Sequence, residues 1–167
     1  LVLLDQAESA LHDLKLELEC LNKNVDICVE VASVRDKYRI DSIFDRYRPT
    51  FVFHAAAYKH VPIMEYFPSE SVLTNVKGTR IVADAAVKFE VKKFIMVSTD
   101  KAVNPTNIMG ACKRVAEMYI QSLSDRSKNT KFVTTRFGNV LGSNGSVVPL
   151  FKKQILQGGP VTVTHPD

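Results

Sequence analysis

The sequence predicts an α/β fold with a doubly wound parallel sheet, and two observations support this prediction. Short apolar runs rich in β-branched residues alternate with segments of helical periodicity along the whole chain. The 167 residues are 46% hydrophobic, which is enough to bury one core. Strands that alternate with helices form parallel sheets through right-handed crossovers.

The first part of the chain contains three strands and two helices. An apolar run ends at Asp5, and leucines then recur at helical spacing. Pro49 ends the second helix, because proline cannot continue one. The expected strands are residues 1–4, 25–31 and 51–54, and the expected helices are residues 9–21 and 37–48.

The rest of the chain continues the alternation. Pro68 suits the first turn of a long helix, and Gly158 and Gly159 suit a helix end. The expected helices are 68 to about 89, one within 105–123, and 148–157. The expected strands are 93–98, 131–136 and 161–164.

Both ends of the sequence lie close to predicted strands. A dinucleotide fold normally begins with a strand and a glycine-rich turn, and an acidic residue follows about 20 residues later. Asp5 suits that acid, but only four residues precede it. We therefore interpret residues 1–167 as a dinucleotide-binding domain truncated at both ends, with the substrate-binding part beginning at about residue 142. We expect this fragment alone to be inactive.

Composition argues against several classes of partner. The net charge is +4, but the basic residues are scattered among acids and form no nucleic-acid footprint. No apolar run approaches the roughly 20 residues that cross a bilayer, and no signal peptide is evident. Cys20, Cys28 and Cys112 lack metal-ligand spacing, so we expect no metal site and a reducing, cytoplasmic location.

Several residues near strand ends could bind a cofactor. Asp5 could accept the ribose hydroxyls of NAD and repel the 2′-phosphate of NADP, or it could simply cap the following helix. Ala55, Ala56 and Ala57 could let a cofactor approach the backbone, or they could reflect tight packing. Asn75 could hold a water or a lysine in an active site, or bond a neighbouring backbone.

Polar groups at two further strand ends could meet a substrate. Lys59 and His60 lie where ligands bind in open α/β sheets, although a lone surface histidine is the more common case. Residues 135–146 leave a strand and enter a glycine-containing loop before a helix, so Asn139 and Ser146 could lie near a diphosphate. A plain turn is the alternative.

The segment with the strongest chemical signal follows the strand at residues 93–98. Thr99, Asp100 and Lys101 place a hydroxyl, a carboxylate and an amine side by side. Met109 and Lys113 are four residues apart on a predicted helix and share one face. The alternative for Lys113 is a solvated surface lysine.

Together these segments resemble the extended short-chain dehydrogenase/reductases, which have a Rossmann-like fold. Within them the chain is similar to the polysaccharide-biosynthesis family of UDP-N-acetylglucosamine 4,6-dehydratases, which serve capsule, O-antigen or flagellin sugars. The residues that carry the resemblance lie at 54–62, 75–79, 98–105 and 136–143.

The resemblance implies roles for individual residues. Thr99, Asp100 and Lys101 match the family's hydroxyl, acid and lysine, and Asp100 and Lys101 would remove the C5 proton and expel the C6 hydroxyl. Met109 and Lys113 match its Tyr-x-x-x-Lys pair, with methionine replacing tyrosine. Ser33 and Val34 would contact the adenine, with Ser33 where an aspartate is usual.

The implied partners are NAD and a UDP-sugar, in a homo-oligomer whose full-length form could be anchored to the inner membrane. The elimination needs a protonated Asp100 and a neutral Lys101, and we expect burial to shift both pKa values in that direction. Two alternatives stay open, namely a UDP-sugar 4-epimerase or reductase of the same superfamily, and a non-catalytic dinucleotide-binding module.

Overall fold

The computed structural model describes residues 1–21, 24–140, 142 and 147–163. Residues Leu1–Arg136 form one compact unit, and Phe137–Asp167 belong to a second. The first unit contains the alternating strands and helices that the sequence predicts, and the second contains helix α7 (Val147–Leu156).

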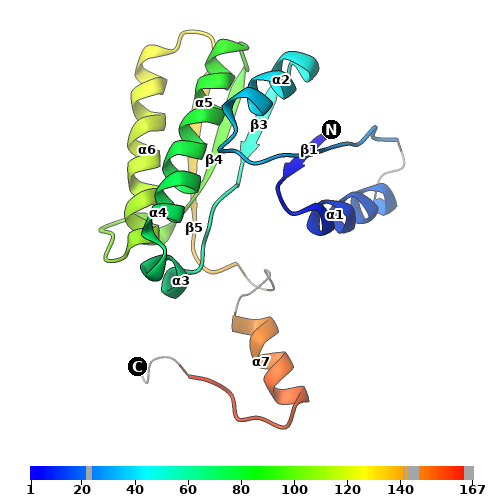
Figure 1. Cartoon of the computed structure of the whole chain (residues 1–167), viewed down its shortest axis with the longest axis vertical. Coiled ribbons are helices and arrows are strands. Elements are labelled where there is room, and N and C mark those ends of the chain that lie inside the picture. Colours follow the sequence, from blue (N-terminus) through cyan, green and yellow to red (C-terminus); the bar gives the residue numbers. More distant parts are fainter. Residues whose placement is uncertain (22–23, 141, 143–146, 164–167) are drawn as a thin grey trace. The chain divides into compact units, whose positions relative to one another are not determined.

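The strands form two sheets (Figure 1). Strand β1 (Val2–Asp5) pairs in parallel with β2 (Cys28–Val31). Strand β3 (Phe51–His54) pairs in parallel with β4 (Lys93–Thr99), and β5 (Lys131–Phe137) follows β4 in the same sheet. The parallel α/β class is confirmed. Within the described residues the strands divide into two sheets, because β1 and β3 are each bonded to a strand on one side only.

Local signals set the helix boundaries. The Asp36 side chain accepts a hydrogen bond from the Arg39 amide at 3.0 Å and caps α2 (Lys37–Tyr47), which ends where Arg48 adopts a left-handed conformation. The Asn107 side chain accepts from the Gly110 amide at 2.8 Å, so α6 (Ile108–Arg126) begins after this residue. Helix α1 covers Glu8–Leu21.

The long helix predicted from Pro68 is present, but it is not regular. It consists of α4 (Pro68–Ser71), a π-helical segment (Val72–Gly78) and α5 (Thr79–Lys88). The sequence analysis also missed α3 (Val61–Tyr66), a short helix with Pro62 in its first turn. π-Helical turns are rare and are frequent at functional sites.

The strand predicted at residues 161–164 is wrong for the described residues 161–163. The amide of Thr162 donates to the Gln154 side chain at 3.1 Å, and its hydroxyl accepts from the same side chain at 2.8 Å. Helix α7 therefore uses the backbone N–H that a sheet would need. Strand β2 also begins later than expected, at Cys28.

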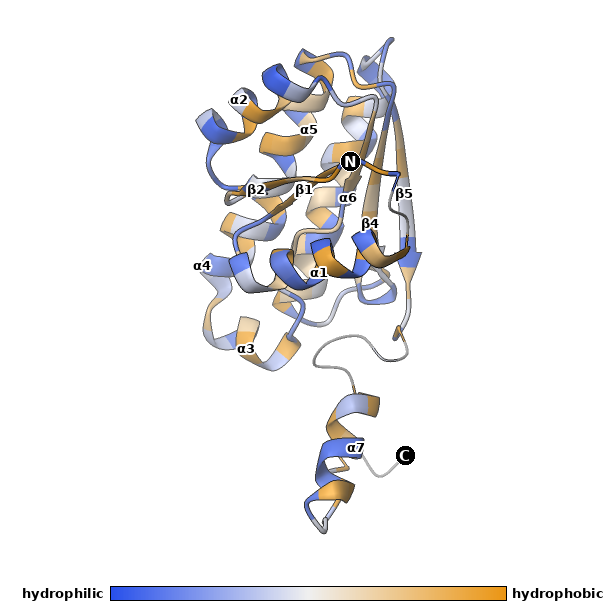
Figure 2. Cartoon of the chain, turned by 90° about the vertical axis from the view of Figure 1, so that its right-hand side faces the viewer, coloured by the Kyte–Doolittle hydropathy of each residue, from blue (hydrophilic) through white to orange (hydrophobic). Residues whose placement is uncertain are grey.

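The core lies between the β3–β4–β5 sheet and the helices on one of its faces. Phe94 and Met96 of β4 alternate inward, and the Phe94 ring lies 5.4 Å from that of Phe132 on β5. Helices α5 and α6 lie side by side against this sheet (Figure 1), and each carries both hydrophobic and hydrophilic residues (Figure 2). This packing places the start of α6 beside the carboxyl end of β4.

Candidate active site at the end of strand β4

The hydroxyl, carboxylate and amine predicted after β4 are in direct contact. Thr99 ends β4, and its hydroxyl donates to Asp100 Oδ1 at 2.9 Å. Lys101 Nζ donates to the same oxygen at 3.0 Å, which makes an ion pair. A single 3₁₀ turn (Asp100–Ala102) holds the three side chains, because the Thr99 hydroxyl also accepts from the Lys101 amide.

The expected rise in the pKa of Asp100 is wrong for the structure as it stands. Hydrogen bonds from Lys101 and Thr99 hold the pKa of Asp100 below its usual value, because they stabilise the carboxylate. The side chain of Asp100 is 57% exposed, so the opposing effect of burial on its pKa is smaller than that of these hydrogen bonds. Asp100 is therefore an ionised group in contact with its lysine.

Lys113 lies one turn after Met109 on α6, and both side chains are buried. Its Nζ donates to the Val97 carbonyl of β4 at 3.0 Å. Burial lowers the pKa of Lys113 to about 8, although the negative charge of Glu117 opposes this shift. The alternative of a solvated surface lysine is wrong.

Gly110 lets α6 approach the turn that carries Asp100 and Lys101 closely. A Cβ added there would lie 2.3 Å from the Lys101 carbonyl oxygen, which is closer than real Cβ atoms approach. Only glycine therefore allows this contact between α6 and the backbone of the Asp100–Lys101 turn.

Asn75 makes the backbone contacts that the sequence analysis offered as its alternative role. Its amide group accepts from the Tyr58 N–H and donates to the Tyr58 carbonyl, each at 2.9 Å, and it also donates to Ser71 Oγ at 3.2 Å. The π-helical segment directs this fully buried side chain toward the loop after β3. Asn75 therefore holds the loop of Ala55, Ala56, Ala57 and Lys59 in place.

The residues predicted to bind the cofactor ribose and adenine lie at one end of the β1–β2 sheet. Asp5 pairs with Val31 at the strand ends, and its carbonyl accepts from the Ala32 amide at 3.0 Å. Ser33 and Val34 follow directly. The Asp5 side chain is exposed and accepts from the Ala7 amide at 2.9 Å, which is a contact of the capping type.

The four predicted substrate residues fall in different parts of the chain. Lys59 and His60 line an apolar pocket of about 320 Å³ beside α3, together with Tyr58, Ile63, Met64, Phe67 and Glu70. Asn139 is exposed and belongs to the second unit. Ser146 lies outside the described residues. The structure brings only Lys59 and His60 together.

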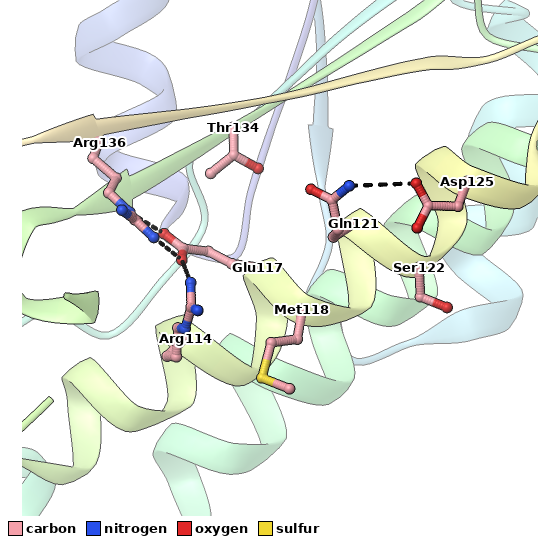
Figure 3. Close-up of a pocket in the computed structure, with 8 residues that line it drawn as sticks. All are labelled: Arg114, Glu117, Met118, Gln121, Ser122, Asp125, Thr134 and Arg136. Atoms are coloured by element: carbon pink, nitrogen blue, oxygen red, sulfur yellow. Dashed lines mark hydrogen bonds and ion pairs between the residues drawn. The ribbon is translucent and has the colours of Figure 1, made fainter. Parts of the chain in front are cut away.

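The sequence analysis missed a charged cluster of Arg114, Glu117 and Arg136, shown in Figure 3. Glu117 accepts two hydrogen bonds from Arg136, at 2.8 and 2.7 Å, and one from Arg114 at 3.1 Å. Burial opposes ionisation of Glu117, but these bonds hold its pKa at about 2. The cluster borders a cavity of about 660 Å³ and fixes α6 to β5. Arg114 and Glu117 lie on α6 and Arg136 lies on β5, so the spacing of residues in the sequence could not reveal the cluster.

The buried His54, at the end of β3, predicts that the folded protein loses stability at low pH. Burial lowers its pKa from 6.5 to about 3, and Lys113 adds to this shift, so the folded protein keeps the ring neutral. The unfolded chain binds a proton there below pH 6.5. Stability from this group is therefore complete above pH 6.5 and falls as the pH decreases toward 3, by on the order of 4 kcal/mol.

Urea unfolding at several pH values should show this loss, and His54→Gln should make the dependence shallower between pH 6.5 and 3. His12→Gln, at an exposed position of α1, provides the control and should leave the slope unchanged. Identical slopes for wild type and His54→Gln would contradict the assignment.

Within the described residues, no group of His, Cys, Asp and Glu is arranged to hold a metal ion. Nor does any helix in that part of the chain have the length and apolarity that a membrane crossing requires.

The sequence is similar to two bacterial proteins with named roles. It is 51% identical over 168 residues to the capsular polysaccharide biosynthesis protein CapD of Staphylococcus aureus, covering 100% of this chain and 28% of that protein. It is 47% identical over 140 residues to a UDP-N-acetylglucosamine 4,6-dehydratase (inverting) of Campylobacter jejuni, covering 81% of this chain and 41% of that protein. The chain thus spans less than half of either relative.

Solved structures share the fold. Pen from Bacillus thuringiensis superposes with a TM-score of 0.86 at 40% identity, covering 98% of this chain and 51% of that one. WbmG of Bordetella bronchiseptica, solved with NAD, has a TM-score of 0.68 at 27% identity and covers 84% of this chain and 48% of that one. The fold is thus of the Rossmann-like type. The model of the family described as "Polysaccharide biosynthesis protein" matches residues 1–167, and the chain belongs to that family.

Proposed function

We propose that the full-length protein is an NAD-dependent UDP-N-acetylglucosamine 4,6-dehydratase, which makes a 4-keto-6-deoxy sugar for bacterial surface polysaccharide. The observation that carries this proposal is the contact between Asp100 and Lys101 at the carboxyl end of β4, where parallel α/β sheets bind ligands. The named activity of the Campylobacter relative supports it.

The residues at the strand ends suit NAD. The adenosine half of NAD would be held by Asp5, Ser33 and Val34. The small side chains of Ala55, Ala56 and Ala57 would let the cofactor come close to the protein backbone. Lys113 would bond the nicotinamide ribose from its buried position, and Asn75 would act by holding the Tyr58 loop. When bound, NAD would accept a hydride from C4 of the sugar and later return it to C6.

The Asp100–Lys101 ion pair can become the reactive acid and base by moving one proton along its 3.0 Å contact. A carboxyl and an amine differ in water by about 6.5 pKa units, so the neutral pair lies about 9 kcal/mol above the ion pair. A bound sugar that excludes water would reduce this difference, because desolvation disfavours both charges. Lys101 would then take the C5 proton, and Asp100 would protonate the leaving C6 oxygen.

Charge and position suggest how the nucleotide part of the substrate would bind. Lys59 lies in the loop that Asn75 holds, and His60 follows it directly. Both would meet the diphosphate of a UDP-sugar as hydrogen-bond donors. We assign Asn139 and Ser146 to the same substrate. Ser146 belongs to the part of the protein that begins at about residue 142, and Asn139 lies just before it in the sequence.

The reaction can be tested by product mass. The full-length protein, incubated with UDP-N-acetylglucosamine and NAD, should form a product lighter by one water without net accumulation of NADH. A 4-epimerase needs no acid–base pair at C5, and its product would keep the mass of the substrate. That outcome, or the absence of turnover with intact NAD binding, would exclude the dehydratase and leave one of the two alternatives.

Asp5 predicts a preference for NAD over NADP. Its exposed carboxylate would repel a 2′-phosphate, so the full-length protein should bind NAD more tightly in calorimetry. Asp5→Asn should reduce this preference, whereas Asp26→Asn, also exposed, should not change it. Tighter binding of NADP by wild type would show that Asp5 serves only the turn at Ala7.

A cytoplasmic location and a homo-oligomeric state are part of this proposal. Cys20, Cys28 and Cys112 are all free thiols, as is usual in a reducing compartment.

A further inference from the structure

Glu65 connects two segments of the candidate site that are far apart in the sequence. It lies on α3, and its carboxylate accepts a hydrogen bond from the Ile108 amide at 2.7 Å. Ile108 is the first residue of α6, the helix that carries Met109 and Lys113. The bond therefore joins α3 to the start of the catalytic helix.

This contact supplies what the start of a helix lacks. The first N–H groups of an α-helix have no partner within the helix, and their dipoles favour a negative charge nearby. Asn107, the residue just before α6, accepts a hydrogen bond from the Gly110 amide. Glu65, 43 residues away in the sequence, accepts a hydrogen bond from the Ile108 amide. Its carboxylate also places a negative charge near the start of the helix.

Helix α3 has its other end in the candidate substrate segment. It begins at Val61, directly after Lys59 and His60, and it is only six residues long. Met64, the neighbour of Glu65, is 5% exposed and fixes one face of this helix in the protein. A bond at the Glu65 end therefore restrains the position of Lys59 and His60.

We propose that Glu65 is a positioning residue, which sets the placement of the Lys59–His60 segment relative to the Met109–Lys113 face of α6. The role in substrate binding rests on the proposed function. Glu65 itself would not touch the reacting atoms, and it acts through the Ile108 amide. Its loss should free both the start of α6 and the substrate segment.

The test uses the full-length protein with Glu65→Ala and Glu65→Gln. Glu65→Ala removes the acceptor, so hydrogen–deuterium exchange should become faster in the peptide that contains residues 108–113. The KM for UDP-N-acetylglucosamine should rise about tenfold, in the range expected for a hydrogen bond to a charged group, while NAD affinity stays within twofold of wild type. Glu65→Gln keeps an acceptor oxygen and should restore most of both properties.

Glu17→Ala, at an exposed position of α1, is the matched control and should leave exchange and KM unchanged. Wild-type exchange and KM in Glu65→Ala would overturn the proposal, and so would equal effects in Glu17→Ala. If wild type forms no dehydrated product, the proposed function fails, but the exchange comparison still decides whether Glu65 positions α6.

Discussion

Replacing Lys101 by methionine in the full-length protein should slow formation of the 4-keto-6-deoxy product by on the order of 10²-fold or more, the usual contribution of a general base. Methionine keeps much of the length of the side chain but has no amine to take the C5 proton. Asp100→Asn should cost a similar factor, because an amide cannot supply the proton that the C6 oxygen needs. Lys101 and Asp100 are both partly exposed, so neither change should disrupt the core.

The two variants should still oxidise the sugar at C4. In the proposed mechanism that step precedes the elimination and would depend on Lys113, which contacts β4 independently through Val97. Rapid-mixing absorbance at the NADH band should therefore show reduction of bound NAD in a single turnover, while product analysis shows little loss of water.

Met109→Leu is the matched control for the acid–base variants. Met109 is 3% exposed, so a truncation would leave a cavity, whereas leucine nearly conserves its volume. A thioether moves no proton, and Met109→Leu should dehydrate at close to the wild-type rate. Near wild-type rates for Lys101→Met and Asp100→Asn would show that this pair is structural.

Gly110→Ala should also reduce the rate strongly, by about 10²-fold. The added Cβ would lie 2.3 Å from the Lys101 carbonyl oxygen, and the atom it meets belongs to backbone that cannot rotate away. The turn that carries Asp100 and Lys101 must then move relative to α6, and a misplacement of about 1 Å can cost that factor. Steady-state kinetics with single-turnover NAD reduction would assign the loss to the elimination step.

Gly78→Ala offers a comparison with a different kind of clash. Its added Cβ would lie 2.6 Å from a terminal methyl of Val34, which is the end of a side chain in the proposed adenine site. We expect weaker NAD binding but an elimination rate close to wild type once NAD is saturating. If Gly110→Ala behaves in the same way, the close contact with Lys101 does not position the pair.

The regular parts of the fold could be predicted because their signals are local. The strand expected at residues 93–98 lies within β4, and Pro49 follows the end of α2 as expected. Helix α3 could not be predicted in this way, because six residues around Pro62 show little periodicity. The π-helical segment was missed for another reason, since Asn75 adopts its position to satisfy the backbone of Tyr58, 17 residues away.

The candidate site was predicted in its residue types but not in its environment. The order Thr99, Asp100, Lys101 follows directly from the chain, and the structure places the three side chains in contact. Hydrogen bonds from Lys101 and Thr99 lower the pKa of Asp100, so the predicted rise in this pKa was wrong. The partnership of Glu65 with Ile108 joins segments 43 residues apart and has no local signal.

The central claim is that Asp100 and Lys101 eliminate water from a sugar oxidised at C4, and deuterium at C4 of UDP-N-acetylglucosamine tests it most directly. With the full-length protein and unlabelled NAD, mass spectrometry should detect a product that has lost one water and still carries the deuterium, because the hydride removed from C4 returns to C6 of the same molecule. Lys101→Met should form little of this product. A labelled product of unchanged mass, or wild-type yields from Lys101→Met, would contradict the account.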